Sequence, residues 1–405
     1  MSEQISFIHA ADLHLDSPFK GLADVPDVIL QEIRESTFVA LDRLVNTAIE
    51  KKVDFILLVG DLFDNEKQSL KAQVRLKRAF EELKRNHISV YLSYGNHDYI
   101  QGNSYPVTYP DNVFIFPKEK VGQFTYKKNE KATATIYGFS YENRSVTEKK
   151  IMEYVITDDT VPFHIGMLHG SVHTNTEHDV YAPFQLSDFM EQDFNYWALG
   201  HIHQREVLKD NPLVVYPGNT QGRHRKETGE KGCYHVVLTE GRSELDFIPL
   251  QAVQFQRVEL DISECQEIHQ VETKIQAALQ TSVNKLYDLI LVSTNTRLKK
   301  WKSEKLFEDI IDLVNETIVY QQAWGYVFRY SFQYPCSSPN RNLYGEEHFI
   351  GELSRHIKED SIQPLLKELY QQRQARKYIT RLSEEEEQSI KAEAEELLLH
   401  ELLKE

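Results

Sequence analysis

Five groups of potential metal-binding side chains recur along the first half of the chain, each directly after a short apolar run. They are Asp12-x-His14, Asp61, Asn96-His97-Asp98, His169 and His201-x-His203. Imidazole, carboxylate and amide oxygen form a hard-to-borderline ligand set that suits Mn²⁺, Fe²⁺ or Zn²⁺ better than Ca²⁺. In an extended His-x-His segment both side chains point the same way, so each can serve one of two adjacent ions. A single such group is ordinarily structural, but five at successive strand ends indicate a metal site.

The apolar runs predict buried strands of an α/β sheet. Phe55–Val59 is unbroken and ends at Gly60, the pattern of a strand that is covered on both faces. Amphipathic helices are expected at 28–49 and 69–84, which gives a βαβαβ start with a parallel sheet and right-handed crossovers. Open α/β sheets bind ligands beyond the carboxyl ends of their strands. All five groups are therefore expected to converge at one sheet edge.

The remaining chain predicts two further parts. Short strands at 112–116, 123–127 and 132–141 suggest an antiparallel continuation, before strands at 163–168, 196–199, 213–216, 233–238 and 245–249. Helices and strands that alternate and then give way to packed strands predict a four-layer αββα sandwich over 1–250. Residues 251–338 are expected to form a small α+β domain with three strands and two helices, and 339–405 a helical region.

Composition excludes several classes of protein. A chain of 405 residues exceeds one ordinary core, so two or three domains are expected. No apolar run reaches the roughly 18 residues of a membrane helix, and the first residues show neither a basic region nor a cleavage signal. Three cysteines (Cys233, Cys265 and Cys336) stand far apart in no metal-binding spacing, which favours a reduced, cytoplasmic protein.

The charge distribution leaves a nucleic-acid partner open. The net charge of −16 argues against one, because like charges repel phosphate. However, residues 384–405 alone hold nine acidic and two basic side chains, a net of −7. Basic residues also cluster around the last histidine motif: Arg205, Lys209, Arg223, Arg225, Lys226 and Lys231.

The order of the motifs resembles that of the calcineurin-like metallophosphoesterases. The family's D-x-H, G-D, G-N-H-D, H-G and G-H-x-H stand here as ADLH, VGDLFD, YGNHD, MLHG and LGHIH. Within that superfamily, HAADLHLDSPFKGL and VVYPGNTQGRH look like the bacterial YhaO-type branch of SbcD-like DNA repair exonucleases. The resemblance covers residues 5 to about 240. Beyond it, related nuclease subunits carry a DNA-capping domain and a helical region that binds a coiled-coil ATPase.

The resemblance implies two divalent metal ions, with Mn²⁺ as the preferred metal, bridged by Asp61. Six further residues would complete the two sites: Asp12, His14 and His203 at one, and Asn96, His169 and His201 at the other. Two cations about 3.5–4 Å apart lower the pKa of a water between them and clamp phosphate oxygens.

Two neighbouring residues receive catalytic roles from the same resemblance. His97 would stay off the metals as a general acid or an electrostatic stabiliser. Asp98 would either orient the His97 ring or hold the turn. Archaeal and eukaryotic relatives have a histidine where this chain has Asp64, so the phosphate-handling role of that histidine is not transferred.

These inferences together predict a two-metal phosphodiesterase that cuts DNA, as an exonuclease subunit in DNA repair working with an SMC-like ATPase. No membrane partner is expected, and a homodimer is possible. A phosphomonoesterase or a small-molecule phosphodiesterase, such as a cyclic-nucleotide hydrolase, is the alternative in chemistry, although small substrates need no addition such as 251–405. A non-catalytic scaffold on the same fold would have lost ligands, and none is lost in this sequence.

The acidic tail at 384–405 carries leucines at helical spacing. It is expected either to pack on its own domain or to dock on the ATPase as a helix in a groove.

Overall fold

The structure, a computed structural model, describes residues 3–333 except 20–21, 23–24, 65–67, 103–106, 174–180, 191–192 and 295–296, together with separate residues between 352 and 394. The chain divides into two compact units, and the first combines Met1–Leu291 with Arg297–Ser331. The boundary expected near residue 250 lies inside this first unit and stays a prediction.

The first six-stranded sheet has the order β12-β11-β1-β2-β3-β4. Its four parallel strands are β1 (Gln4–Ala11), β2 (Phe55–Val59), β3 (Ser89–Ser93) and β4 (Val113–Ile115). Two antiparallel strands extend it beside β1: β11 (Gly232–Thr239) and β12 (Arg242–Pro249). Every residue of β2 is buried, as its apolar run predicted.

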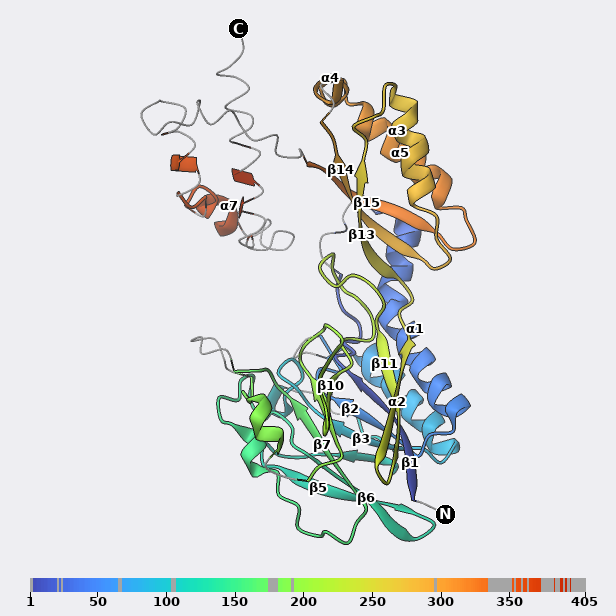
Figure 1. Ribbon diagram of the computed structural model, residues 1–405, viewed down its shortest axis with the longest axis vertical. Helices are drawn as coiled ribbons and strands as arrows, with labels where there is room; N and C mark the ends of the chain where they lie inside the picture. Colours follow the sequence, from blue (N-terminus) through green and yellow to red (C-terminus); the bar gives the residue numbers. More distant parts are fainter. Residues whose placement is uncertain are drawn as a thin grey trace. The chain divides into compact units, whose positions relative to one another are not determined.

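Two helices cover one face of this sheet, as Figure 1 shows. They are α1 (Asp27–Lys51) and α2 (Leu70–Arg85). The Ser69 side chain caps α2 by accepting a hydrogen bond from the Ala72 amide at 3.1 Å, which satisfies one otherwise unpaired N–H of the first turn. Lys52 follows the last residue of α1, and its left-handed backbone ends the helix before the chain enters β2.

The second six-stranded sheet has the order β5-β6-β7-β8-β10-β9. Its strands are β5 (Gly122–Lys128), β6 (Lys131–Gly138), β7 (Phe163–His169), β8 (Tyr196–Gly200), β9 (Glu206–Asp210) and β10 (Leu213–Tyr216). Only the edge strands β5 and β9 pair antiparallel with their neighbours.

The expected antiparallel continuation is confirmed for β5 and β6, which pair antiparallel, and is wrong for β4. Strand β4 runs parallel to β3, and β6 runs parallel to β7. The connection from β6 to β7 contains the short 3₁₀ helix η2 (Lys150–Glu153) and otherwise irregular chain. Because a crossover without a long helix leaves no 3.6-residue periodicity, the sequence carried no sign of it.

The four-layer sandwich is confirmed. One apolar cluster fills the space between the two sheets, with Phe7, Leu57 and Tyr196 among its members. A second cluster lies between the first sheet and its helices, and a third covers the outer face of the second sheet. In the described chain that outer layer is built from η2, η3 (Leu186–Met190) and loops.

A three-stranded sheet of order β13-β14-β15 follows the sandwich. Its strands are β13 (Gln254–Asp261), β14 (Lys285–Val292) and β15 (Gly325–Gln333), and its helices are α3 (Ile268–Ala278), α4 (Arg297–Ser303) and α5 (Leu306–Ile318). The sequence predicted these strands and two of the helices, whereas α4 was not expected.

The helical region expected at 339–405 lies mostly outside the described residues. Within the described part of this region, α7 (Lys367–Gln371) is a short helix. The docking of the acidic tail lies outside the described residues as well. Among the helices that the structure describes, none has the length and hydrophobicity needed to cross a membrane.

Candidate metal centre

The predicted metal ligands lie at strand ends of both sheets rather than at the edge of one. Asp12, Asp61 and Asn96 follow β1, β2 and β3, whereas His169 ends β7 and His201 follows β8. The expectation of a single sheet edge is thus corrected: the sheets are stacked, and their carboxyl ends meet. They approach closely there, because a Cβ on Gly200 would lie 2.1 Å from the Val59 carbonyl.

Four of the ligand positions have a left-handed backbone. The φ angles are 52° at Asp12, 42° at His14, 49° at Asp61 and 97° at His201. Such angles are costly for residues other than glycine and persist only where the surroundings enforce them. Backbone hydrogen bonds do so here, from the Asp12 amide to the Gly60 carbonyl at 3.2 Å and from the His14 amide to the Asp61 carbonyl at 3.0 Å.

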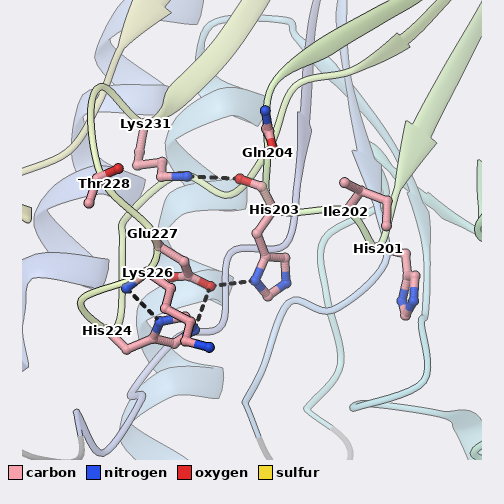
Figure 2. Close-up of a pocket in the computed structure, with 9 residues that line it drawn as sticks. All are labelled: His201, Ile202, His203, Gln204, His224, Lys226, Glu227, Thr228 and Lys231. Carbon is pink, nitrogen blue, oxygen red and sulfur yellow. Dashed lines mark hydrogen bonds and ion pairs between the residues drawn. The ribbon is translucent and has the colours of Figure 1, made fainter. Parts of the chain in front are cut away.

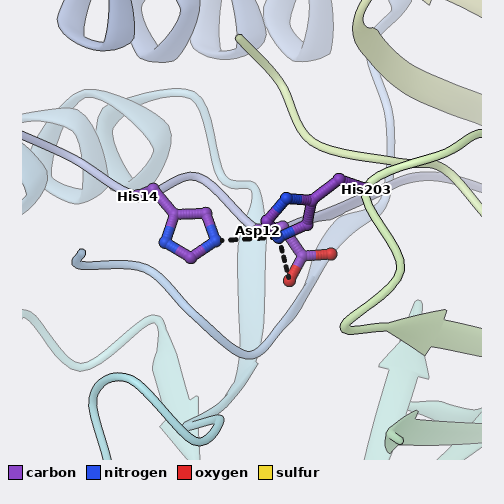
Figure 3. Close-up of side chains that lie close together, drawn as sticks. All are labelled: Asp12, His14 and His203. Atoms are coloured by element: carbon purple, nitrogen blue, oxygen red, sulfur yellow. Dashed lines mark hydrogen bonds and ion pairs between the residues drawn. The ribbon is translucent and has the colours of Figure 1, made fainter. Parts of the chain in front are cut away.

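The first ligand cluster contains Asp12, His14 and His203 (Figure 3). The Nε2 atoms of the two histidines lie 3.1 Å apart, and His203 Nε2 lies 4.0 Å from Asp12 Oδ1. Two imidazole nitrogens on one ion, each about 2.0–2.1 Å from it, stand about 3.0–3.4 Å apart. The donor set and its spacing therefore fit a divalent metal ion.

The second cluster converges on the amide oxygen of Asn96. Asn96 Oδ1 lies 3.0 Å from His169 Nε2 and 3.1 Å from His201 Nδ1. His169 donates its Nδ1 proton to the Val59 carbonyl at 3.1 Å, so Nε2 is the ring atom that faces the cluster. These three residues fit a second ion of the same kind.

Asp61 stands between the two clusters. Its Oδ2 lies 3.5 Å from His169 Nε2 and 3.9 Å from His14 Nε2, while its Oδ1 accepts the His97 amide proton at 2.9 Å. One oxygen thus faces both clusters, as a bridging ligand requires. The other oxygen secures the loop that carries Asn96 and His97.

The buried charges of the centre perturb one another. Burial raises the pKa of Asp12 to about 6, against the opposing effect of His203. Burial would also raise the pKa of Asp61, but the charge and hydrogen bond of His169 outweigh it and lower that pKa. Conversely, burial opposes protonation of His169, yet Asp61 raises its pKa to about 9.

Two other histidines of the centre, His14 and His201, have lowered pKa values. Burial, reinforced by the Arg223 charge, holds the pKa of His14 well below its usual value. Burial and the charge of His169 lower the pKa of His201 to about 3. Both imidazoles are neutral at physiological pH and keep a lone pair for a metal ion.

His97 and Asp98 occupy different environments. His97 donates its Nδ1 proton to the Asp64 carbonyl at 3.0 Å, which leaves Nε2 on the free side of the ring. Both Asp98 oxygens accept backbone protons, from Gly95 and from Leu62, each at 2.7 Å. The contacts of Asp98 are those of a residue that holds the turn. The contact that orients the His97 ring comes from the Asp64 carbonyl instead. A catalytic role for either residue stays a prediction.

Sequence reasoning gave no role at this centre to three charged residues. Glu227 Oε1 lies 2.6 Å from His203 Nδ1, and Arg223 forms an ion pair with Asp64. Asp64 itself forms a third potential ligand group with His14 and His97. The motif VVYPGNTQGRH includes Arg223, but the sequence placed this residue only in the basic cluster around the last histidine motif.

Two members of the predicted basic cluster turn inward. The Arg223 side chain is 14% exposed, and Lys231 donates from Nζ to the His203 carbonyl at 2.9 Å. Lys231 also lines a cavity of about 520 Å³, together with His201, His203, His224 and Lys226 (Figure 2). The local cationic surface is therefore smaller than the sequence suggested.

The fold and the ligand clusters are those expected of a metal-dependent phosphoesterase. Residues 5–205 match the calcineurin-like phosphoesterase family. The chain belongs to this family, whose members use divalent metal ions.

The chain is also similar to individual proteins. The chain is 37% identical over 408 residues to the uncharacterized metallophosphoesterase YhaO of Bacillus subtilis, which covers 99% of both chains. It is 28% identical over 294 residues to the DNA double-strand break repair protein Mre11 of Methanocaldococcus jannaschii, covering 69% of this chain and 72% of the relative. Among solved structures, a dimetal phosphatase from Danio rerio aligns with 61% of this chain and 96% of its own at a TM-score of 0.37 and 12% identity.

Proposed function

We propose that the chain is a two-metal phosphodiesterase that hydrolyses DNA as an exonuclease. The observation that carries this proposal is the similarity to Mre11, which spans 69% of the chain and so exceeds the family match at residues 5–205. A similarity confined to the metal centre would support any phosphoesterase. The longer one favours a substrate shared with a DNA repair protein.

The ligand clusters support a hydrolytic mechanism. Bound divalent ions supply Lewis acidity toward a phosphate and lower the pKa of water. Asp12, His14 and His203 would hold one ion, and Asn96, His169 and His201 the other, with Asp61 between them. We assign Mn²⁺ to both sites, because mixed imidazole, carboxylate and amide donors suit a borderline cation.

His97 supplies the proton that the leaving group needs. Its Nδ1 proton is committed to the Asp64 carbonyl, so the proton to be transferred resides on Nε2. A deoxyribose oxygen is a poor leaving group as an alkoxide, and protonation by a positioned imidazolium contributes about 10²–10⁴-fold to such reactions. Asp98 keeps the loop in place through the amides of Gly95 and Leu62.

We further propose a cellular setting from the resemblance to SbcD-like nucleases. In this setting the chain acts in the cytoplasm with an SMC-like coiled-coil ATPase. The α+β part at 251–338 would cap the DNA, and the helical region at 339–405 would bind the ATPase. Co-purification of the full chain with a candidate ATPase, compared with a chain ending at Leu382, tests the last assignment.

Substrate preference tests the main proposal. The metal-free protein is reloaded with Mn²⁺ and given linear double-stranded DNA, bis-nitrophenyl phosphate and nitrophenyl phosphate in parallel. We expect release of nucleotides from the DNA ends, slower cleavage of the synthetic diester and the least turnover of the monoester. Asp61→Asn serves as the inactive control. Intact DNA together with rapid monoester hydrolysis would refute a DNA phosphodiesterase.

A further inference from the structure

Behind the first ligand cluster lies a buried carboxylate. Glu227 is 7% exposed, and its Oε1 lies 2.6 Å from Nδ1 of His203 (Figure 2). Its Oε2 accepts two hydrogen bonds, from the Arg223 amide at 2.7 Å and from Asn219 Nδ2 at 2.9 Å. His224 Nε2 approaches Oε1 as well, at 3.3 Å. A buried carboxylate with both oxygens engaged is fixed in place, and it fixes the imidazole it contacts.

His14 has a carboxylate on the equivalent side of its ring. Its Nδ1 is buried and makes no regular hydrogen bond to any described residue, but it lies 3.5 Å from Asp64 Oδ1. The Nε2 atoms of His14 and His203 face each other at 3.1 Å. Both imidazoles thus present Nε2 to the proposed ion and Nδ1 to a carboxylate.

Arg223 connects the two carboxylates. Its Nη1 pairs with Asp64 Oδ1, and its Nη2 lies 3.7 Å from Glu227 Oε1. The Arg223 and Asp64 side chains are only 14% and 15% exposed, so solvent screens this pair weakly. A planar guanidinium with several fixed N–H groups is suited to holding two carboxylates at a set separation.

In the second cluster, the described groups that form hydrogen bonds with the Nδ1 atoms of the histidines are not carboxylates. His169 donates from Nδ1 to the Val59 carbonyl, and His201 Nδ1 faces Asn96, itself a predicted ligand. Main chain and neutral amide therefore support the second cluster. The carboxylate of Asp12 lies 4.0 Å from His169 Nδ1, farther away than the Val59 carbonyl, and it is itself a predicted ligand of the first cluster.

We propose that Asp64, Arg223 and Glu227 form an ion-pair network that positions His14 and His203 and sets the metal affinity of the first site. This inference rests on the proposed two-metal function. An imidazole that donates its Nδ1 proton to a carboxylate keeps its Nε2 lone pair toward the metal and becomes a stronger ligand. The three are positioning residues, since they act through the histidines. The network also gives Asp64 a function that does not depend on the histidine found there in relatives.

The substitution Glu227→Gln tests the network in the full chain. The new side chain would direct its amide NH₂ either toward the Arg223 amide and Asn219 Nδ2 or toward His203 Nδ1, so one donor always faces another. We expect Mn²⁺ titration calorimetry to show one of the two ions bound about 10–100-fold more weakly and the other unchanged. The exchange-coupled electron paramagnetic resonance signal of a Mn²⁺ pair should give way to that of a single ion.

Glu230→Gln is the matched control, because it removes the same charge three residues along in an exposed position. Arg223→Lys keeps the positive charge but loses the planar guanidinium that can contact two carboxylates. Binding of the same ion should therefore weaken by a smaller factor. Melting curves in EDTA show whether each variant is folded before metal is added. If Glu227→Gln fails to fold, Arg223→Lys and Asp64→Asn carry the test by the same measurements.

Three results overturn the network. In the first, folded Glu227→Gln binds both ions with native affinity. In the second, both sites weaken equally, as a general structural role would predict. In the third, the native protein shows no coupled ion pair, and the proposed two-metal function then fails together with the network. The first two leave that function intact, so the failures are distinguishable.

Discussion

Replacing His97 with alanine separates proton transfer from metal binding. The His97 amide donates to Asp61 Oδ1 at 2.9 Å, a contact that alanine retains. The ring contributes its Nδ1 bond to Asp64 and lies with its centroid 5.1 Å from that of His14. It belongs to neither of the two clusters proposed to hold metal. We therefore expect His97→Ala to keep both ions and its affinity for DNA.

The expected loss is in turnover. Removing a general acid lowers kcat by about 10²–10⁴-fold, which corresponds to about 2.7–5.4 kcal/mol in activation free energy. The loss should depend on the leaving group. A nitrophenolate leaves without protonation, so cleavage of bis-nitrophenyl phosphate should fall by less than about tenfold while DNA cleavage falls by the full factor.

Single-turnover DNA cleavage, diester hydrolysis and metal content by mass spectrometry are measured on the same preparations. His269→Ala, an exposed histidine on α3, is the control for loss of an imidazole. An equal loss on both substrates would rule out a general acid and favour electrostatic stabilisation. Loss of an ion would show instead that His14, Asp64 and His97 form a metal site. Unchanged DNA cleavage would refute any catalytic role.

Three further changes test the centre and its scaffold. Asp61→Asn should abolish turnover and lose at least one ion, because its Oδ2 faces both clusters; two tightly bound ions with normal activity would contradict this. Gly95→Ala would place a Cβ 2.3 Å from Asp61 Oδ1 and 2.8 Å from His169 Nε2, so it should destabilise the metal-free fold by about 1–3 kcal/mol in urea titrations and weaken the second ion. Burial lowers the pKa of His9 from 6.5 to about 3. On acidification the unfolded state therefore takes up this proton at a higher pH than the folded state does. The contribution of His9 to stability is fully present above pH 6.5 and decreases as the pH falls below it. In EDTA, His9→Gln should remove about 2 kcal/mol of the stability difference between pH 7 and pH 5, and an unchanged difference would exclude this cause.

The ligand positions could be predicted because each depends on a local pattern. A buried strand followed by Asp, Asn or His places that side chain at the carboxyl end of a strand, whatever the rest of the fold. What the pattern could not show is which sheet each strand joins. Strands β2 and β7 look alike as apolar runs, yet they belong to different sheets.

The supporting residues could not be predicted, because they depend on where loops meet. Asp64 and Arg223 are 159 positions apart and form an ion pair in space. In the sequence, Arg223 looks like its neighbours Arg225 and Lys226, and nothing local separates a buried cation from a solvated one. Glu227 likewise sits in a charged stretch, and only its burial reveals that it contacts His203.

The two clusters are therefore held by different means, and this difference has a chemical consequence. A main-chain carbonyl supports His169, and no side-chain substitution at Val59 removes it. Carboxylates support His14 and His203, so we expect changes at Asn219 and Glu227 to act mainly on the first site. Asp61 is the one ligand that both sites share, and its second oxygen is bound to the loop of His97. We therefore expect Glu227 to set affinity at the first site, whereas changes at Arg223 or Asp64 would also reach the carbonyl that orients the His97 ring.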